Sequence, residues 1–336
     1  MTHYTTDTYK MKREILNFSK IFSGALSAPN RKFFADMTYG ILASQSCLLS
    51  KIAHALQEDQ KKIYTVDRLS GHLKDGADSK ALAAYLDYVR KMAPSEPVVH
   101  IDDSDVVKPE GYHFETLGIV RDGSKSTNGK SVYTKGYHVT EACVLADSNH
   151  PVSIFSRIHS PNEKGFTSAN HITFNAIERG AELFKKATYV MDRGYDDNKM
   201  FNKLWELGRD FVIRLTRKRK LLFHGKWVSA ASLCAQRKGK VKMDLFYKGK
   251  SHEAYGNTAQ LRLRIADAIV RCCLNNCVQK TGYISVYLAE NTLQSAARTP
   301  CQKGQRPFLT VCLPAPSQSR QIVSGYMANW KMQNAA

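Results

Sequence analysis

Short runs of β-branched and other apolar residues, separated by turns and helical stretches, set the pattern of residues 94–213. Two of these runs, Val98–Ile101 and Thr188–Met191, end at aspartates. Strand-like runs and a helix with one apolar face separate the two, and a further helix and strand follow. This order predicts an α/β fold, a mixed sheet flanked by helices. The intervening strands are expected at 112–120, 137–145 and 151–158, the helix around Phe174, Ile177, Ala181 and Phe184, and the last helix and strand at 200–207 and 211–213.

The first 93 residues carry a different periodicity. From residue 31, apolar residues recur in steps of three and four, as they do along one face of a helix. A second helical stretch, Ala77–Met92, ends before Pro94 and Pro97. Residues 1–93 are therefore expected to form a small helical N-terminal domain. The first apolar series is Phe34, Met37, Ile41, Leu48, Ile52 and Ala55, with the small Ser44 in its one position that is not apolar.

The chain after residue 213 is strongly basic and then loses its pattern. Residues 214–250 contain twelve Lys or Arg and one acid, Asp244. Short strand-like runs there predict a basic β-rich insertion over 214–303, within which 256–303 has no clear periodicity. The last segment, 304–336, is expected to hold a strand at 308–313 and a helix at 318–333.

The charge of the whole chain favours a polyanionic partner. There are 49 Lys and Arg against 30 Asp and Glu, a formal net charge of +19. Nucleic acid is the leading partner because each neutralised phosphate releases condensed counterions, although a basic protein can also use its charge only to stay soluble. No apolar run is long enough to span a bilayer, and no secretory signal pattern is present. Eight cysteines without a Cys-x-x-Cys pair and eleven histidines without a His-x-x-x-His pair predict no zinc site and a reduced, cytoplasmic protein.

Aspartates follow both of the runs named first: Asp102 and Asp103 follow one, and Asp192 follows the other. A carboxylate at the C-terminal end of a strand points into the crevice where open α/β sheets bind ligands. Two such carboxylates on neighbouring strands can share hard divalent cations, which prefer oxygen ligands. A pair of such ions can activate a water or a DNA 3′-hydroxyl and stabilise the leaving oxygen. The alternative is that these acids only cap turns or start helices.

The residues around these acids resemble motifs of DDE-type insertion-sequence transposases. Residues 101–109 (IDDSDVVKP) are similar to the first-aspartate motif, and residues 190–197 (VMDRGYDD) to the second, in which Arg follows Asp. The third acid of that family lies on a helix in a Tyr-x2-Arg-x3-Glu-x6-Lys signature, and residues 326–333 (YMANWKMQ) have its register. The resemblance runs from about residue 31 to the C-terminus and is weakest at 256–303. Three motifs in the right order form a specific signal, whereas each alone would be weak.

The resemblance implies a ribonuclease H-like catalytic core built from 94–213 and 304–336, with 1–93 as a DNA-binding domain. The spacing between Asp192 and position 333 leaves room for the β insertion that this branch of the family carries. Asp103 is the favoured first catalytic acid, because in the family a Ser or Thr follows that acid directly, as Ser104 does here. Asp102 is the alternative, since neighbouring strand residues point to opposite faces of a sheet.

The third motif departs from the family pattern. Asn329 replaces the signature arginine, Gln333 replaces the signature glutamate, and the sequence ends at Ala336, before the position of the signature lysine. A glutamine carbonyl can touch a metal ion but carries no charge. Gln333 is therefore the expected third catalytic position, in a copy that we expect to be degenerate or truncated and impaired.

Several residues are expected to contact DNA. Arg193, directly after Asp192, is interpreted as a phosphate contact, with a surface ion pair as the alternative. A basic cluster follows the last core strand and is either a DNA-backbone track or a solvated edge. The helix of the third motif places its Tyr, Asn and Gln on one face. The residues concerned are Arg217, Lys218, Arg219, Lys220, Tyr326, Asn329 and Trp330, the last with core packing as its alternative.

The resemblance implies a bacterial transposase that binds terminal inverted repeats and target DNA, as a homodimer, and cuts and joins strands with two Mg²⁺ or Mn²⁺ ions. Asp103 and Asp192, together with Asp102, are the expected metal ligands. A second hypothesis is a catalytically inactive DNA-binding protein that represses a related element. A third is a nuclease of the same fold that does not transfer strands, because fold does not fix function. A cytoplasmic, nucleoid-associated location fits all three.

Overall fold

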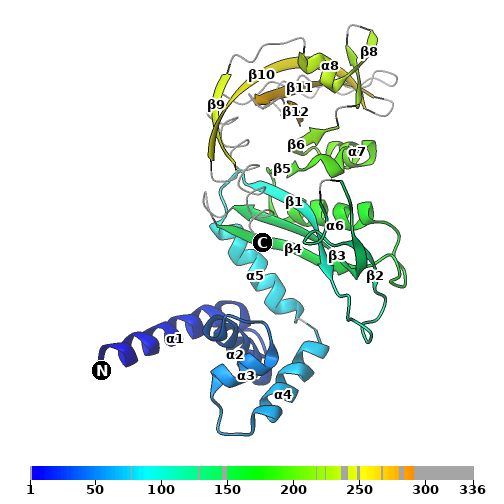
Figure 1. Cartoon of the computed structure of the whole chain (residues 1–336). Helices are drawn as coiled ribbons and strands as arrows, with labels where there is room; N and C mark the ends of the chain where they lie inside the picture. Colours follow the sequence, from blue (N-terminus) through cyan, green and yellow to red (C-terminus); the bar gives the residue numbers. More distant parts are fainter. Residues whose placement is uncertain are drawn as a thin grey trace, which may run out of the picture. The chain divides into compact units, whose positions relative to one another are not determined.

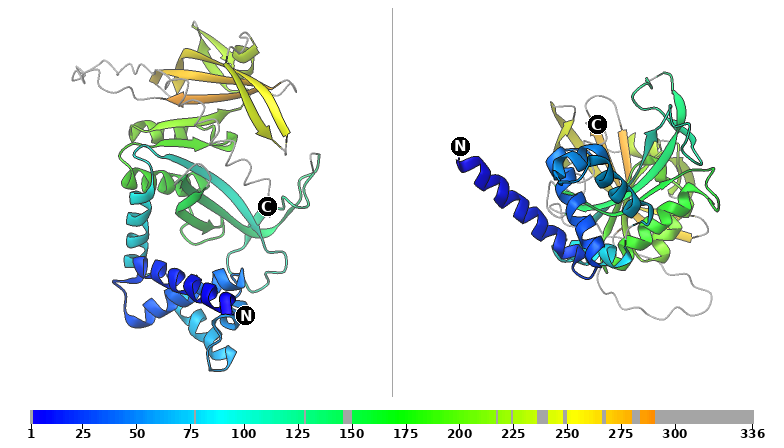
Figure 2. Two further views of the ribbon diagram at one scale, coloured as in Figure 1. Left: turned by 90° about the vertical axis from the view of Figure 1, so that its left-hand side faces the viewer. Right: turned by 90° about the horizontal axis from the view of Figure 1, so that it is seen from below.

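The structure, a computed structural model, divides into two compact units, Met1–Met92 and Ala93–Ala336. Their elements are labelled in Figure 1, and Figure 2 gives two further views. No described helix is long and apolar enough to cross a membrane. The structure describes residues 2–76, 78–127, 129–145, 150–216, 218–223, 225–235, 241–247, 250–265, 268–279 and 284–290.

The described part of the first unit is helical (Figure 1). Gln45 adopts a left-handed conformation with φ 50°, so the helix that the sequence predicted to run on from residue 31 breaks there. Leu48 is consequently 60% exposed, although the apolar series placed it on the buried face, while Ile52 is fully buried. A Cβ on Gly40 would lie 2.4 Å from Ile52 Cγ2, so the second helix needs glycine where it meets the third. The helices are α1 (Thr2–Ser23), α2 (Ala28–Ser44), α3 (Leu49–Leu56), α4 (Lys62–Lys74) and α5 (Ser79–Met92).

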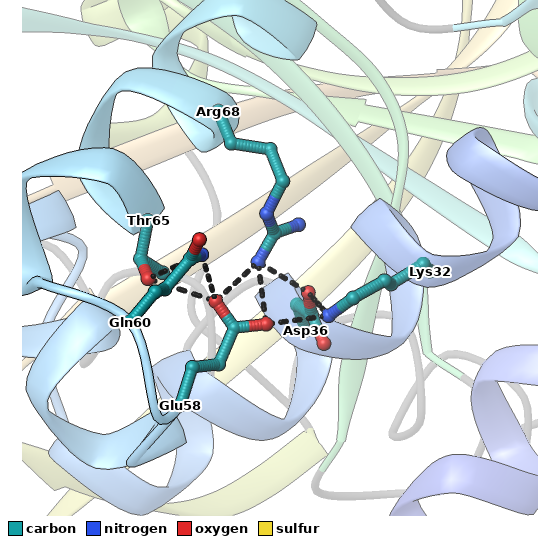
Figure 3. Close-up of polar contacts among 6 residues, drawn as sticks. All are labelled: Lys32, Asp36, Glu58, Gln60, Thr65 and Arg68. Carbon is teal, nitrogen blue, oxygen red and sulfur yellow. Dashed lines mark hydrogen bonds and ion pairs between the residues drawn. The ribbon is translucent and has the colours of Figure 1, made fainter.

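A polar network joins α2 to the turn between α3 and α4 (Figure 3). Lys32 bridges Asp36 at 2.7 Å and Glu58 at 2.6 Å, and Arg68 bridges the same two carboxylates at 2.8 and 3.0 Å. Thr65 donates a further hydrogen bond of 2.8 Å to Glu58, and Gln60 donates one of 2.9 Å. Burial alone would raise the pKa of Glu58, but these four donors together lower it to about 2.

The second unit is built on a mixed sheet. The central strand β1 (Val98–Val107) pairs antiparallel with β3 (Tyr133–Leu145) on one side and parallel with β5 (Thr188–Met191) on the other. The strands beyond β3 pair antiparallel with β3, and the strand beyond β5 pairs parallel with β5. This order and direction of strands is the ribonuclease H-like arrangement. The remaining core strands are β2 (Gly118–Arg121) and β4 (Pro151–His159), both paired with β3, and β6 (Asp210–Leu215), paired with β5.

The helix α6 (Ala169–Leu183) crosses from β4 to β5 and packs against β1, β3 and β4. Ser168 caps its first turn by accepting a hydrogen bond from the His171 backbone N–H. Gly180 lies against Tyr189, whose hydroxyl donates to the Ile177 carbonyl at 3.0 Å. Because Tyr189 pairs in register with Val99, α6 covers the face of the sheet that carries Val99 and every second residue after it.

Two expectations for the core strands are wrong in their bounds. The first strand does not stop at Asp102 but continues to Val107, because β3 is long enough to pair with it through the acidic residues. The strand expected at 112–120 is confined to β2, and residues 112–117 form a loop. Pairing with a distant strand, rather than local apolar pattern, decides both outcomes.

Beyond β6 the sheet continues through the segment whose pattern the sequence left unassigned. β12 (Ile284–Glu290) pairs antiparallel with β6, and β11 (Ala268–Gln279), β10 (Lys250–Ile265) and β9 (Val241–Tyr247) follow in that order (Figure 1). The expected strand and helix at 304–336 lie outside the described residues. The other elements are the 3-10 turn η1 (Arg193–Tyr195), α7 (Asn198–Glu206), the hairpin β7 (Lys220–Phe223) and β8 (Lys226–Ser229), and α8 (Ala230–Ala235).

Candidate active site

Asp102 lies on the face of the sheet that carries His100. His100 pairs in register with Val190 on the parallel strand β5, and Asp192 follows directly after this strand ends at Met191. Asp103 belongs to the opposite face, together with Ile101 and Val99. Because the strand continues through both acids, alternation places Asp102 and Asp103 on opposite faces, and the charge of Asp192 acts on Asp102.

The surroundings of Asp102 disfavour its charge. Burial raises its pKa, and the charges of Asp192 and Asp103 raise it further, to about 7, against one backbone hydrogen bond from Asp103 that lowers it. Burial lowers the pKa of His100, on the same face, to about 4, so this histidine is neutral near pH 7 and supplies no cation. The thiol of Cys143, which pairs in register with His100, has its pKa raised to about 11 by burial and by Glu141 and Asp102. Asp102 thus lies near the carboxylate of Asp192, with Glu141 directly across from it on β3 and the neutral His100 and Cys143 on the same face.

Asp192 is held by the backbone that follows it. It forms the N-cap of η1, and its Oδ1 accepts a hydrogen bond from the Gly194 N–H. The residue is exposed, as is Arg193 beside it. One carboxylate oxygen is therefore oriented by the turn.

Asp103 has protein donors instead. Thr140, directly across on β3, donates a hydrogen bond of 2.6 Å to Asp103 Oδ1. The Thr140 oxygen lies 3.0 Å from His159 Nε2, and since the hydroxyl proton goes to Asp103, the imidazole must donate here. This chain of hydrogen bonds is what a structural carboxylate requires. Thr140 and His159 were not found from the sequence, because only the pairing of β1, β3 and β4 brings them to Asp103.

The loop after Asp192 is anchored to the start of the insertion. The Asp196 side chain is 1% exposed; its Oδ2 accepts the Thr216 N–H at 2.7 Å and its Oδ1 forms an ion pair with Arg219 Nε. Arg219 also donates to the Asp196 carbonyl at 2.9 Å and to Asn198 Oδ1 at 2.8 Å, and its guanidinium lies 5.1 Å from the centre of the Phe201 ring. Arg219, which the sequence suggested as a DNA contact, is thereby committed to contacts within the protein.

The Tyr195 hydroxyl lies within this region as well. It is buried and meets no partner with hydrogen-bond geometry among the described residues. Burial, followed by the charges of Asp103 and Asp102, raises the pKa of Tyr195 well above its usual value. The tyrosine is therefore neutral and lies close enough to these acids to feel their charge.

The remaining expected site residues divide into two groups. Lys218 and Lys220 are exposed, as a contact to DNA requires. Arg217 and the third-motif residues Tyr326, Asn329, Trp330 and Gln333 lie outside the described residues. Within the described ranges, no three or more His, Cys, Asp or Glu side chains gather in a way that could hold a metal ion.

Comparison with known proteins shows the family to which the chain belongs. The sequence profile of the family described as transposase DDE domain matches residues 93–295, well over half of the chain, and the protein belongs to this family. No curated protein matches the chain. Among solved structures, the chain is similar to piggyBac transposase in a cryo-EM structure of its synaptic complex with hairpin DNA, at 9% sequence identity and a TM-score of 0.38. That similarity covers 83% of this chain and 58% of the other.

Proposed function

We propose that the protein is a transposase that binds the ends of a mobile DNA element and cleaves and joins DNA strands with divalent metal ions. Membership of the transposase DDE family supports a role in transposition. The metal-dependent step rests on one observation: Asp102 and Asp192 follow Ile101 and Met191, which pair in register on neighbouring parallel strands, and the charge of Asp192 acts on Asp102. Asp103 has no ligand role in this proposal, because Thr140 already holds it.

The two carboxylates fit a divalent cation. The pKa of Asp102 is raised by burial and then by the charges of Asp192 and Asp103, and hard cations bind carboxylate oxygens. Bound Mg²⁺ or Mn²⁺ would activate the attacking oxygen and offset charge on the phosphate. Asp102 and Asp192 would hold the ions, and the Gly194 N–H would fix the orientation of Asp192.

The DNA itself would meet the exposed cations around this site. Arg193 follows Asp192 directly and can donate to a phosphate, while Lys218 and Lys220 can follow the DNA backbone. Arg219 keeps their loop in place. The N-terminal helical unit is proposed to bind the element ends, and the protein is proposed to act as a homodimer.

Gln333 favours a second candidate function. As the third ligand position it lacks the charge of a glutamate, so the metal site would be weak. The second candidate is accordingly a DNA-binding protein without catalytic activity that represses a related element. Both candidates share DNA binding and differ only in strand cleavage.

A cleavage assay with Mg²⁺ or Mn²⁺ on DNA that carries the element's ends tests the proposal. The unmodified chain should cut close to background, and Gln333→Glu should raise cleavage on the order of a hundredfold, because a misplaced metal shell can cost that much. Adding Asp102→Asn to Gln333→Glu should return cleavage to background. Cleavage that survives Asp102→Asn would overturn the metal site, and binding without cleavage in Gln333→Glu would support the repressor.

A further inference from the structure

Large apolar side chains that face solvent gather in one part of the second unit. Six are exposed among its described residues, and four of these fall between residues 112 and 133. Isolated exposed apolar residues are ordinary, but a cluster marks a surface that binds something. The four are Tyr112 (74% exposed), Phe114 (54%), Ile119 (64%) and Tyr133 (64%); the other two are Ile158 on β4 and Trp227 on β8.

The pairing of β2 with β3 places part of this cluster on one face together with two cations. Ile119 lies opposite Lys135, and Arg121 lies opposite Tyr133. Gly118 and Val120, which alternate with them, are buried. One face of the hairpin is therefore solvent-exposed and carries aromatic, aliphatic and positively charged side chains next to one another.

The loop before β2 extends this face. The Lys135 ammonium lies over the Tyr112 ring at 6.0 Å, and the Lys108 ammonium lies over the Phe114 ring at 5.7 Å. Two acids contact this region: Glu110 accepts a hydrogen bond of 2.9 Å from the Tyr112 hydroxyl, and Asp105 Oδ2 accepts one of 3.2 Å from the Arg121 N–H. We call β2, the start of β3 and the loop 108–117 the aromatic hairpin.

Hydrogen bonds fix the conformation of this loop. The Asn162 side chain donates to the Leu117 carbonyl at 2.7 Å, and the Tyr137 hydroxyl donates to the Glu115 carbonyl. The Lys108 N–H donates to the Lys135 carbonyl at 2.8 Å. The exposed rings are therefore held in place before any partner arrives, which lowers the entropic cost of binding.

We propose that the aromatic hairpin binds DNA with unpaired bases. Rings stack on bases of any sequence, and lysine and arginine between them neutralise the adjacent phosphates. A second protein surface fits less well, because lysine is depleted from the centre of protein interfaces. Paired bases offer no free face for stacking, so a DNA end with unpaired nucleotides is the expected ligand. The inference rests on the proposed function only in requiring that the protein binds DNA. It requires neither metal ions nor catalysis.

Fluorescence anisotropy of the full chain without divalent metal tests this surface. The probes are a blunt duplex and the same duplex with a single-stranded tail. The parent protein should bind the tailed DNA more tightly. Tyr112→Ala with Tyr133→Ala should weaken tailed-DNA binding about a hundredfold, at about tenfold per lost stack, and should change blunt-duplex binding less than about twofold.

Matched variants separate stacking from charge and from folding. Tyr133→Phe keeps the ring and should bind like the parent, and Ile158→Ala removes an exposed apolar side chain away from the hairpin and should also bind like the parent. Lys135→Gln should reduce the dependence of log K on log salt by about 0.7 for the tailed DNA.

Two results would overturn the proposal. One is a double variant that binds both DNAs like the parent but loses self-association in sedimentation, because the face would then join two copies of the chain. The other is an equal loss for tailed and blunt DNA. Absence of DNA binding by the parent would overturn the proposed function itself, whereas absence of cleavage alone leaves this measurement intact.

Discussion

Asp102 and Asp103 are adjacent in sequence, but their side chains have different hydrogen-bond partners and neighbouring charges. Asp103 faces β3, where Thr140 donates to it and His159 supports Thr140. Asp102 faces away from α6, beside Asp192, and its pKa rises to about 7. A carboxylate that protein donors satisfy contributes to folding, while a carboxylate left beside another one is costly until a cation binds. This difference supports the proposal that Asp102, rather than Asp103, holds the metal ion.

Asp196 is the strongest case of a carboxylate satisfied by the protein, and removing its partner should have the largest effect. Arg219→Ala leaves a carboxylate that is 1% exposed without its ion pair, so we expect a loss of about 3–5 kcal/mol in the free energy of unfolding of the second unit. All three tryptophans, at 205, 227 and 330, lie in this unit, so urea unfolding followed by tryptophan fluorescence reports it.

Lys220→Ala is the matched control for that variant, because Lys220 is exposed and lies one residue away. Its effect should stay within about 0.5 kcal/mol. If Arg219→Ala were as mild as Lys220→Ala and instead weakened DNA binding, Arg219 would be a DNA contact after all.

Substitutions of the two adjacent acids, Asp102 and Asp103, should differ in their effect on metal affinity. Asp102→Asn removes a proposed ligand and should weaken Mn²⁺ binding by more than roughly a hundredfold, whereas Asp103→Asn should weaken it by only about tenfold, the lower end of the effect of groups outside the ligand set. Calorimetric titration of the Gln333→Glu protein with Mn²⁺ measures both. A larger loss for Asp103→Asn would reverse the assignment made from strand alternation.

The sequence predicted elements that are defined locally and missed those defined by pairing. The strand Thr188–Met191 was predicted with its observed bounds, because a β-branched threonine and three apolar residues stop at an acid and a turn. The strand from Val98 was predicted too short, since polar residues such as Ser104 gave no sign that β3 pairs with them. Asp103 was favoured for a different reason, because Ser104 follows it as in the family, and alternation along the strand left Asp102 as the alternative. Residues such as Thr140 approach the site only through long-range pairing, which periodicity along the chain does not reveal.

The breaks between helices were a second feature that the sequence pattern did not predict. The apolar series through residue 41 and Leu48 assumed one continuous helix, but Gln45 turns the chain. No proline or glycine marks this break in the sequence, and the turn is stabilised by Ser44, whose hydroxyl donates to the Gly40 carbonyl at 2.6 Å. The polar network at Glu58 then depends on how the separate helices meet, which the sequence did not predict.

Glu58 completes the comparison, because its pKa is shifted in the opposite direction from that of Asp102. The folded protein lowers the pKa of Glu58 from 4.5 to about 2. The ionised form is therefore favoured by folding: this stability is fully present above about pH 4.5 and is lost as the pH falls toward 2. Because the network is partly exposed to solvent, we expect a contribution on the order of 1–2 kcal/mol.

The prediction is that Glu58→Gln destabilises the first unit at pH 7 but makes its stability less dependent on pH between about 4.5 and 3. Since the first unit contains no tryptophan, hydrogen exchange of peptides from 28–74 is the appropriate measurement. Asp59→Asn, at the exposed neighbouring acid, is the control and should keep the pH dependence of the parent. If Glu58→Gln and the parent lost protection in parallel as the pH fell, the ion pairs around Glu58 would be too well screened to count. The rule that separates satisfied from unsatisfied carboxylates would then apply only to buried sites such as Asp196.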